Sequence, residues 1–337
     1  YRERIRFNGA WVDEAELVAA FEAVDAARGD ISLSYFEWSA LAAFHLIARR
    51  QPQVAVLEVG LGGRLDATNI IDADAAIITR IGLDHQDWLG HDTETIAREK
   101  AGIIRPGQRV FLPDAHPPAA LTARADELGA TVYRYGDALH VKEQPDSIQI
   151  TVPGFTARLP KPPLMPGAHQ YGHLAAALAA LAPWLRLDAA RVAHAVIHTQ
   201  NPARLMQIAG EPRWLFDVAH NADSAEVLAA WLHDMPRHGR FIALCGMLRD
   251  KDHHAIYRHL APEIDQWILT GLPGVRGTDV ATLATHAREA GIAAEKLLSC
   301  EDINTACQQA CTLARAEDTV VVFGSFVTVA AVLEKHT

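Results

Sequence analysis

The sequence has few cysteines, no long apolar run and no excess of positive charge. Its four cysteines form no C-x-x-C pair, so nothing indicates the disulfide framework of a secreted protein. We therefore expect a cytoplasmic protein whose cysteines are small, buried apolar residues. No apolar stretch approaches the ~20 residues of a membrane span. The formal net charge of −10 disfavours a nucleic-acid-binding surface, although a local basic patch stays open. We expect neither a membrane nor a nucleic acid as a partner.

What the sequence does have is the composition of a globular α/β protein. Half of its 337 residues are hydrophobic and 21% are charged, and this length suffices for about two domains. Apolar residues three and four apart predict helices, and short apolar runs predict strands. Their alternation predicts a parallel sheet with helices on both faces, then a boundary near 199–203 and a smaller Rossmann-like domain. The predicted elements of the first part include strands at 54–57, 75–81, 109–112 and 131–135, a hairpin at 147–160, and helices at 13–28, 35–50, 93–104 and 173–185.

The run EVGLGGRLDATN, residues 58–69, is the most informative stretch. It follows the predicted strand 54–57, so the carboxylate of Glu58 would lie at a strand end, where ligands bind in open α/β sheets. Its glycines do not fit the dinucleotide fingerprint, because the third is misplaced and no helix follows. No Gly-Lys-Ser/Thr follows either, as a P-loop requires. A hard cation beside a phosphate suits Glu58, since Mg²⁺ takes one or two carboxylates plus phosphate oxygens.

Two further stretches of the first part carry candidate side chains. DHQDWLG, residues 84–90, places His85 at the end of the next strand, where it would lie beside Glu58 as a metal ligand; a solvated turn remains the alternative. Lys100 lies on a mostly apolar helix in REKAGII. A surface lysine whose stem covers apolar neighbours is the ordinary interpretation of such a residue.

The predicted second domain offers a matching set. FDVAHN places Asp217 and Asn221 just past a strand, where helix N-capping is the alternative role and a strong one for Asn221. Arg204, just after the predicted boundary, could bind phosphates with both arms of its guanidinium. GMLRDKD, residues 246–252, is a polar loop at another strand end and could form a wall of the same cleft.

These stretches together resemble the folylpolyglutamate synthase family of the Mur ligase superfamily, including its bifunctional bacterial members. The resemblance spans almost the whole chain and rests on seven motifs in the family's order: YFE, EVGLGGRLDATN, LDHQDWLG, REKAGI, FDVAHN, GMLRDKD and FGSF. It implies a central ATPase-type parallel-sheet domain over residues 1–200. A smaller Rossmann-like C-terminal domain would occupy residues 201–337.

The resemblance also implies an activity: an ATP-dependent amide ligase that adds L-glutamate to dihydropteroate and to folates. The substrate carboxylate takes the γ-phosphate of ATP, giving an acyl phosphate, and the amine of glutamate then displaces phosphate. The expected cofactor is Mg²⁺, as two ions, and ATP is the expected co-substrate. A monomer is the default expectation for the oligomeric state. A catalytically silent fragment or paralogue that binds a pterin or nucleotide is the alternative. A Rossmann redox protein is a third hypothesis, weakened by the misplaced glycine.

By this likeness, roles can be carried over residue by residue. Glu58, His85 and Lys100, the last as an N-carboxylated lysine, would be catalytic and would bind the metal. The residues that match ATP contacts are His173, Arg204 and Asp217. The residues that match the pteroate pocket are Ser34, Tyr35, Phe36, Glu37, Leu65, Asp66 and Ala67.

The chain also departs from the family pattern. It begins at Tyr1 rather than at methionine, and we expect that an N-terminal portion with the family's phosphate-binding loop precedes it. His173 stands where relatives carry an asparagine. Ala203 stands in place of the glycine of Pro-Gly-Arg. These differences concern the adenine side of the expected site, whereas the metal-side residues all match.

Overall fold

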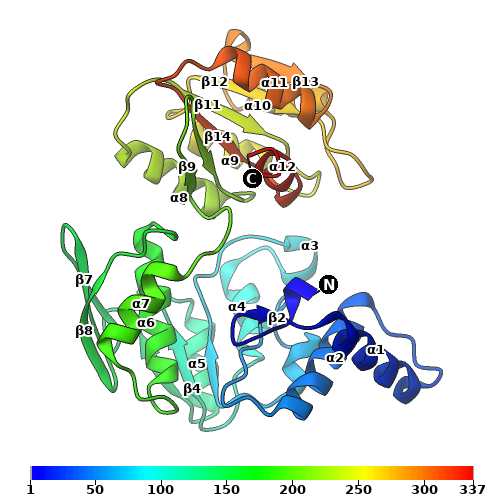
Figure 1. The fold of residues 1–337 in the computed structure, drawn as a ribbon, viewed down its shortest axis with the longest axis vertical. Coiled ribbons are helices and arrows are strands. Elements are labelled where there is room, and N and C mark those ends of the chain that lie inside the picture. Colours follow the sequence, from blue (N-terminus) through cyan, green and yellow to red (C-terminus); the bar gives the residue numbers. More distant parts are fainter. Residues whose placement is uncertain (1, 337) are drawn as a thin grey trace.

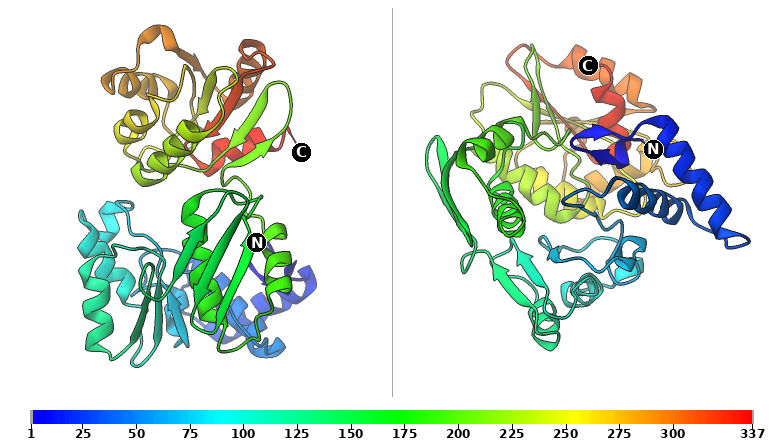
Figure 2. Two further views of the ribbon diagram at one scale, coloured as in Figure 1. Left: turned by 90° about the vertical axis from the view of Figure 1, so that its left-hand side faces the viewer. Right: turned by 60° about the horizontal axis from the view of Figure 1, so that its bottom comes forward.

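Two lobes stacked along the longest axis make up the fold of the computed structural model, which describes residues 2–336 (Figure 1). No β-sheet of the described residues extends from one lobe into the other. The chain passes from the first lobe to the second between α7 (Ala189–His198) and β9 (Met206–Ile208). Figure 2 shows the same two bodies from two other directions. Within the described residues, no helix combines the length and the hydropathy needed to cross a bilayer.

A three-stranded parallel sheet forms the centre of the first lobe. Its order is β3 (Ala75–Ile77), β4 (Arg109–Leu112), β5 (Thr131–Arg134). Successive side chains of a strand point to opposite faces, so Val110 and Leu112 pack into one core cluster and Phe111 into another. The first cluster is covered by α4 (Thr93–Ala101) and α5 (Ala119–Glu127), and the second by α6 (Ala168–Leu181). Helices on both faces of a parallel sheet are therefore confirmed.

An antiparallel sheet flanks this centre. The predicted hairpin is confirmed as β7 (Ser147–Val152) and β8 (Phe155–Pro160), joined at Pro153-Gly154 with Gly154 at φ 79°. A third strand, β6 (His140–Glu143), pairs with β7 and was not predicted. Its sequence is short and mostly exposed, so it shows little of the alternation of apolar and polar residues that predicts a strand.

The first fifty residues form a helical pair. A short turn of helix, η1 (Arg2–Arg4), and the small ribbon β1 (Arg6–Phe7) and β2 (Ala10–Trp11) precede α1 (Glu14–Arg28) and α2 (Tyr35–Arg50). The two helices pack on each other through a cluster that includes Leu17, Ala20 and Leu46. Both were predicted, whereas Tyr1 lies outside the described residues.

The predicted strand at 54–57 is wrong. Those residues are irregular, none is buried, and Val56 is 87% exposed. A strand buried in a parallel sheet needs pairing neighbours and covered faces, and no described strand pairs with this stretch. The strand predicted at 75–81 is also shorter, ending at Ile77, and the helix predicted at 173–185 runs from Ala168 to Leu181.

The second lobe is a six-stranded sheet with the order β13-β12-β11-β14-β10-β9. All its pairings are parallel except that of the edge strand β9 with β10. Helices cover both faces, so the predicted Rossmann-like second part is confirmed. The strands not yet bounded are β10 (Arg213–Phe216), β11 (Phe241–Cys245), β12 (Gln266–Thr270), β13 (Leu297–Cys300) and β14 (Thr319–Phe323). The helices are α8 (Ala222–Asp234), α9 (His253–Leu260), α10 (Val280–Glu289), α11 (Ile303–Leu313) and α12 (Phe326–Leu333).

The core of this lobe lies on both faces of the sheet. Val321 packs with α8, α9 and α10, whereas its neighbours Val320 and Val322 pack with α11 and α12. Three of the cysteines are buried in this lobe, as expected, but Cys311 is exposed on the outer side of α11. All four are free thiols.

Candidate active site between the lobes

Asp66 holds the glycine turn in shape. One oxygen of its carboxylate accepts hydrogen bonds from the backbone N–H groups of Gly60 and Leu61, at 2.9 and 3.1 Å. The other oxygen accepts from the N–H and the hydroxyl of Thr68, at 2.9 and 2.7 Å. The side chain thus ties the start of the turn to the short helix η2 (Ala67–Ile70) that follows it. A carboxylate predicted to face a substrate is therefore engaged with its own backbone.

The turn packs directly on the last part of α4. A Cβ atom on Gly63 would lie 2.9 Å from the carbonyl oxygen of Glu99 and 3.1 Å from Cα of Lys100. On the facing side, a Cβ on Gly102 would lie 2.4 Å from Cβ of Arg64. Arg64 also donates its backbone N–H to the Glu99 carbonyl and its guanidinium to the Glu99 carboxylate. Two glycines are needed here because two backbones touch, and the contact places Lys100 beside the turn.

Lys100 has no partner in this position. Its ammonium forms no hydrogen bond or ion pair with any described residue, although the side chain is half-buried. Burial lowers the pKa of Lys100 below its ordinary value, and the negative charge of Asp84 opposes part of that shift. A half-buried amine without a counter-ion is unusual for a structural lysine.

Asp84 joins the two lobes. Its carboxylate accepts from Nζ of Lys251 at 2.7 Å and from the side-chain amide of Asn221 at 3.0 Å, and it lies 3.4 Å from Nε2 of His220. The Lys251 side chain is only 5% exposed. Burial alone would raise the pKa of Asp84, but the hydrogen bonds from these three side chains outweigh it and hold the pKa well below its usual range. The carboxylate is therefore ionised at neutral pH.

The loop that supplies Lys251 is fixed to the last strand of the sheet. A Cβ on Gly324, whose φ is 105°, would lie 2.7 Å from the carbonyl oxygen of Gly246, so the two chains touch. Thr328 donates its hydroxyl to the same carbonyl at 2.8 Å. This contact brings the GMLRDKD and FGSF segments together at the carboxyl edge of the sheet, where ligands bind in this architecture.

Arg204 lies in a tightly held loop at the same edge. Asp217, almost fully buried, accepts from the N–H groups of Leu205 and Ala219 at 2.8 Å each. Ala203 and Leu205 have φ of 57° and 50°, a conformation that disfavours side chains. The guanidinium of Arg204 lies 5.6 Å from the ring centroid of Phe326, so the loop aims this cation across the start of α12.

Comparisons with known proteins agree with this geometry. The profile of the Mur ligase glutamate ligase domain matches residues 203–326. The dihydrofolate synthase/folylpolyglutamate synthase of Escherichia coli (strain K12) is 39% identical over 336 residues, covering 99% of this chain and 77% of the relative. The solved structure of E. coli FolC in complex with DHPP and ADP is 38% identical, with a TM-score of 0.92 over 100% of this chain and 79% of that one. A bifunctional folylpolyglutamate synthase/dihydrofolate synthase solved with Mn, AMPPNP and L-glutamate is 35% identical, with a TM-score of 0.89, over 100% of this chain and 80% of that one.

The chain belongs to the dihydrofolate synthase/folylpolyglutamate synthase family. None of these findings specifically supports the alternative of a catalytically silent paralogue. Family membership also agrees with the fold, because a parallel-sheet lobe is followed by a lobe that the glutamate ligase profile matches.

The pterin-side residues expected from the dihydrofolate synthase/folylpolyglutamate synthase pattern lie on two elements that meet. The ring of Phe36, on the first turn of α2, is 2.9 Å from where a Cβ of Gly60 would lie. Ser34 and Glu37 form a reciprocal capping box at the start of α2, so they stabilise the helix end whatever else they contact. Tyr35 and Leu65 are exposed and Ala67 is half-buried.

The metal-side residues of the family pattern are free to bind. Glu58 and His85 are exposed, and neither side chain forms a hydrogen bond or ion pair with a described residue. His85 has φ of 52°, and Leu89, four residues later, lies against the turn, 2.9 Å from where a Cβ of Gly62 would be. A carboxylate, an imidazole and a carboxylated lysine are suitable donors for a divalent cation. That these three hold magnesium, as two ions, stays a prediction.

The nucleotide-side residues are placed less uniformly. Asn221 caps α8 in a box with Ser224, as its alternative role predicted, and it also bonds Asp84. His173 lies in the first lobe on α6, half-buried, and its Nδ1 is 3.4 Å from Oε1 of the Gln170 side chain. Burial lowers its pKa. Gly167, just before α6, approaches Leu205, so the start of that helix lies beside the Arg204 loop.

Sequence reasoning did not single out Asp84, Lys251 or His220. All three lie inside motifs that were recognised, and Asp84 and His220 directly precede the chosen residues His85 and Asn221. Lys251 was visible only as one of several charges in GMLRDKD. A buried lysine requires an anionic partner, so knowing that Lys251 is buried would have pointed to it. Burial in a polar loop, however, cannot be inferred from sequence periodicity.

Proposed function

We propose that this protein is an ATP-dependent ligase that joins L-glutamate to dihydropteroate and to folates. The observation that carries the proposal is the contact of Asp84 with Lys251 and Asn221. It brings the segment of the first lobe that bears His85 against the lobe that bears Arg204. The names of the relatives and the ligands in their structures support the same activity. We also propose domains at 1–200 and 201–337; a cytoplasmic, monomeric protein stays a prediction.

The proposed chemistry needs two substrates held on facing lobes. Phe36 would offer an aromatic face to the pterin ring, with the glycine turn as the other wall. Arg204 would bind the phosphates of ATP and neutralise charge that develops during phosphoryl transfer. His173 and Asp217 are also proposed to contact ATP. Asp217 in addition fixes the Arg204 loop, because it accepts two backbone hydrogen bonds there.

Glu58, His85 and Lys100 are proposed to hold Mg²⁺, as two ions. When bound, the ions would screen the phosphate charges and orient the γ-phosphate. The free side chains of Glu58 and His85 support this role. So does Lys100, because only a neutral amine reacts with carbon dioxide to form a carbamate and release a proton. The half-buried, unpaired position and the lowered pKa both favour the neutral amine.

The test is an assay of phosphate release by the natural-length protein. We expect release that requires ATP, Mg²⁺, dihydropteroate and L-glutamate together. Omitting glutamate should leave at most slow release, because the acyl phosphate then reacts only with water. Phosphate release that is indifferent to both dihydropteroate and folates would overturn the proposal.

A further inference from the structure

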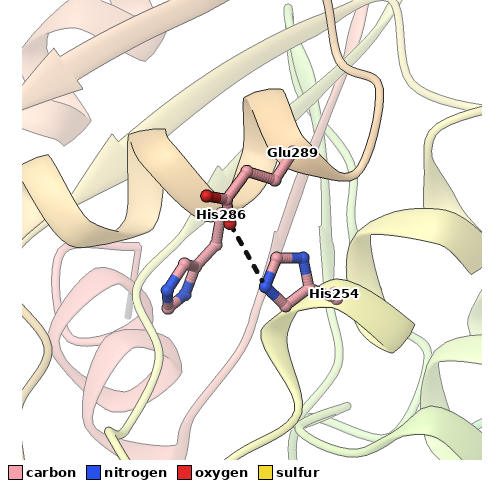
Figure 3. A group of neighbouring side chains, drawn as sticks. All are labelled: His254, His286 and Glu289. Carbon is pink, nitrogen blue, oxygen red and sulfur yellow. Dashed lines mark ion pairs between the residues drawn. The ribbon is translucent and has the colours of Figure 1, made fainter.

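Three potential metal ligands gather on the second lobe, outside the site described above. His254 belongs to the first turn of α9, and His286 and Glu289 lie three residues apart on α10, so they share one face of that helix. Each offers one ligand atom, and the three atoms lie within 4.8 Å of one another. No other group of three histidine, cysteine or carboxylate side chains within residues 2–336 meets this criterion. Figure 3 shows the three side chains converging between the two helices.

The separation of His254 and Glu289 suits a small, tetrahedral ion. Nitrogen and oxygen ligands of zinc lie about 2.0–2.2 Å from the metal, which places neighbouring ligand atoms roughly 3.3–3.5 Å apart. Nε2 of His254 and the carboxylate of Glu289 are 3.5 Å apart. That separation is too long for a strong hydrogen bond. Within the described chain, Glu289 forms no ion pair with a lysine or arginine.

A third histidine, His253, fixes the proton on His286. Nε2 of His253 is 2.9 Å from the carbonyl oxygen of Leu248, and because a carbonyl only accepts, this nitrogen carries the hydrogen. Nδ1 of a neutral His253 must then accept, and it lies 2.9 Å from Nδ1 of His286. His286 is thereby the donor through Nδ1, which leaves the lone pair of its Nε2 for a metal. This carbonyl–histidine–histidine chain is the kind of outer arrangement that orients metal-bound imidazoles.

We propose that His254, His286 and Glu289 form a binding site for a transition-metal ion of the zinc class, with His253 as a positioning residue. Two imidazoles and one carboxylate favour zinc over magnesium or calcium, which prefer oxygen ligands. Three protein ligands leave one position for water or for a further ligand. The site lies beside the polar loop 246–252, because the Leu248 carbonyl that anchors His253 belongs to it. It is independent of the proposed ligase activity.

The test is calorimetric titration of zinc chloride into the natural-length protein, followed by Co²⁺ as a spectroscopic probe. We expect wild type to bind one more zinc ion than His254→Gln, with visible bands of tetrahedral cobalt that this variant lacks. Glu289→Gln should bind zinc at least about tenfold more weakly. His253→Gln should keep the stoichiometry and lose about 10–100-fold in affinity, as outer residues of metal sites do.

A matched control lies in the same lobe. His233 and Glu263 form a pair of the same chemistry, at 3.2 Å, with no third ligand beside them. His233→Gln should therefore titrate like wild type. The proposal is overturned if His254→Gln and Glu289→Gln bind zinc as wild type does, or if His233→Gln loses as much. Melting curves distinguish a loss of zinc binding from a folding defect. Zinc should raise the melting temperature of wild type but not that of His254→Gln.

Discussion

At the scale of single residues, Lys100 is the side chain whose position is least explained by a structural role. A lysine that covers apolar neighbours normally extends its ammonium to water or to an acid. Here the ammonium pairs with no acidic side chain of the described residues, and Asp84, whose negative charge acts on its pKa, already binds Lys251. This arrangement fits an amine that is modified rather than one that pairs.

Replacing Lys100 tests that interpretation. We expect Lys100→Ala to lose about 100-fold or more of the ligase rate, because an anionic ligand near the phosphates is removed. Acetate or another short carboxylate in the buffer should restore part of the rate. Lys100→Arg is the matched variant, since it keeps the positive charge but forms no carbamate. Full activity of Lys100→Arg would show that the charge, not the carbamate, is what the site uses.

Glu58 gives a second prediction at this scale. Glu58→Gln removes one negative charge from an exposed side chain that has no protein partner, so stability should change by less than about 0.5 kcal/mol. The Mg²⁺ concentration for half-maximal rate should rise at least about tenfold, because magnesium prefers charged oxygen ligands. A titration of rate against Mg²⁺ measures this. Glu22→Gln on α1 is the control, and an unchanged magnesium dependence in Glu58→Gln contradicts the assignment.

At the scale of elements, the contact between the glycine turn and α4 decides where Lys100 lies. Gly63→Ala would push a Cβ into the Glu99 carbonyl, and Gly102→Ala into Arg64. We expect either change to destabilise the protein by about 1–3 kcal/mol. Both should also raise KM for dihydropteroate, because Gly60, in the same turn, packs against the ring of Phe36. Steady-state kinetics together with urea unfolding separate the two effects.

The control for this pair is Gly129→Ala. A Cβ there meets no atom within 4 Å, but φ is 59°, so only backbone strain is added. It should lower stability by about 1 kcal/mol without changing KM. If Gly63→Ala leaves KM at the wild-type value while stability falls, the turn is a structural contact and not a wall of the pterin pocket.

Elements were predictable where their own periodicity is strong. The helices α1 and α2 and the strand β4 came from spacing alone, and the capping residue Ser34 marks the start of α2. The stretch 54–57 shows the limit, because its apolar sequence is that of a buried strand but its surroundings supply no pairing strand. Short exposed strands such as β6 carry too few alternations to be recognised.

The residues of the candidate site also divide into those that their own segment makes recognisable and those that only a long-range contact reveals. Glu58 and His85 became candidates because each stands out in its own segment, whereas Lys100 became one only through the family resemblance. Asp84 and Lys251 are 167 residues apart in sequence, and their importance follows only from their contact. Nor could the sequence show that Asp66 bonds its own turn, since a carboxylate after a glycine run suits a ligand equally well.

At the scale of the whole molecule, the lobes meet through charged side chains. Asp84 binds Lys251 and Asn221, and Arg80 lies 3.5 Å from Asp223 in an exposed pair. Exposed pairs contribute little, whereas an acceptor for a lysine that is 5% exposed matters more. The relation between the lobes should therefore depend on Asp84 far more than on Asp223.

Asp84→Asn tests this dependence. We expect it to lower the free energy of unfolding at pH 7 by about 1.5–3 kcal/mol, the range for a hydrogen bond to a charged group. Partial exposure of the carboxylate favours the lower part of that range. Asp223→Asn, on the same interface, should cost less than about 1 kcal/mol. Urea unfolding of both variants measures the difference, and X-ray scattering should show a larger radius of gyration for Asp84→Asn alone.

The pH dependence of that difference has a definite sign. The folded state holds the pKa of Asp84 well below its usual range, so the unfolded chain takes up the proton first. The stabilisation is complete above the unfolded pKa, about 4, and is lost as the pH falls below it. Wild type and Asp84→Asn should therefore differ by the same amount from pH 7 to about pH 5 and converge below about pH 4. A gap that widens on acidification would mean that Asp84 is not the ionised partner of Lys251 in solution.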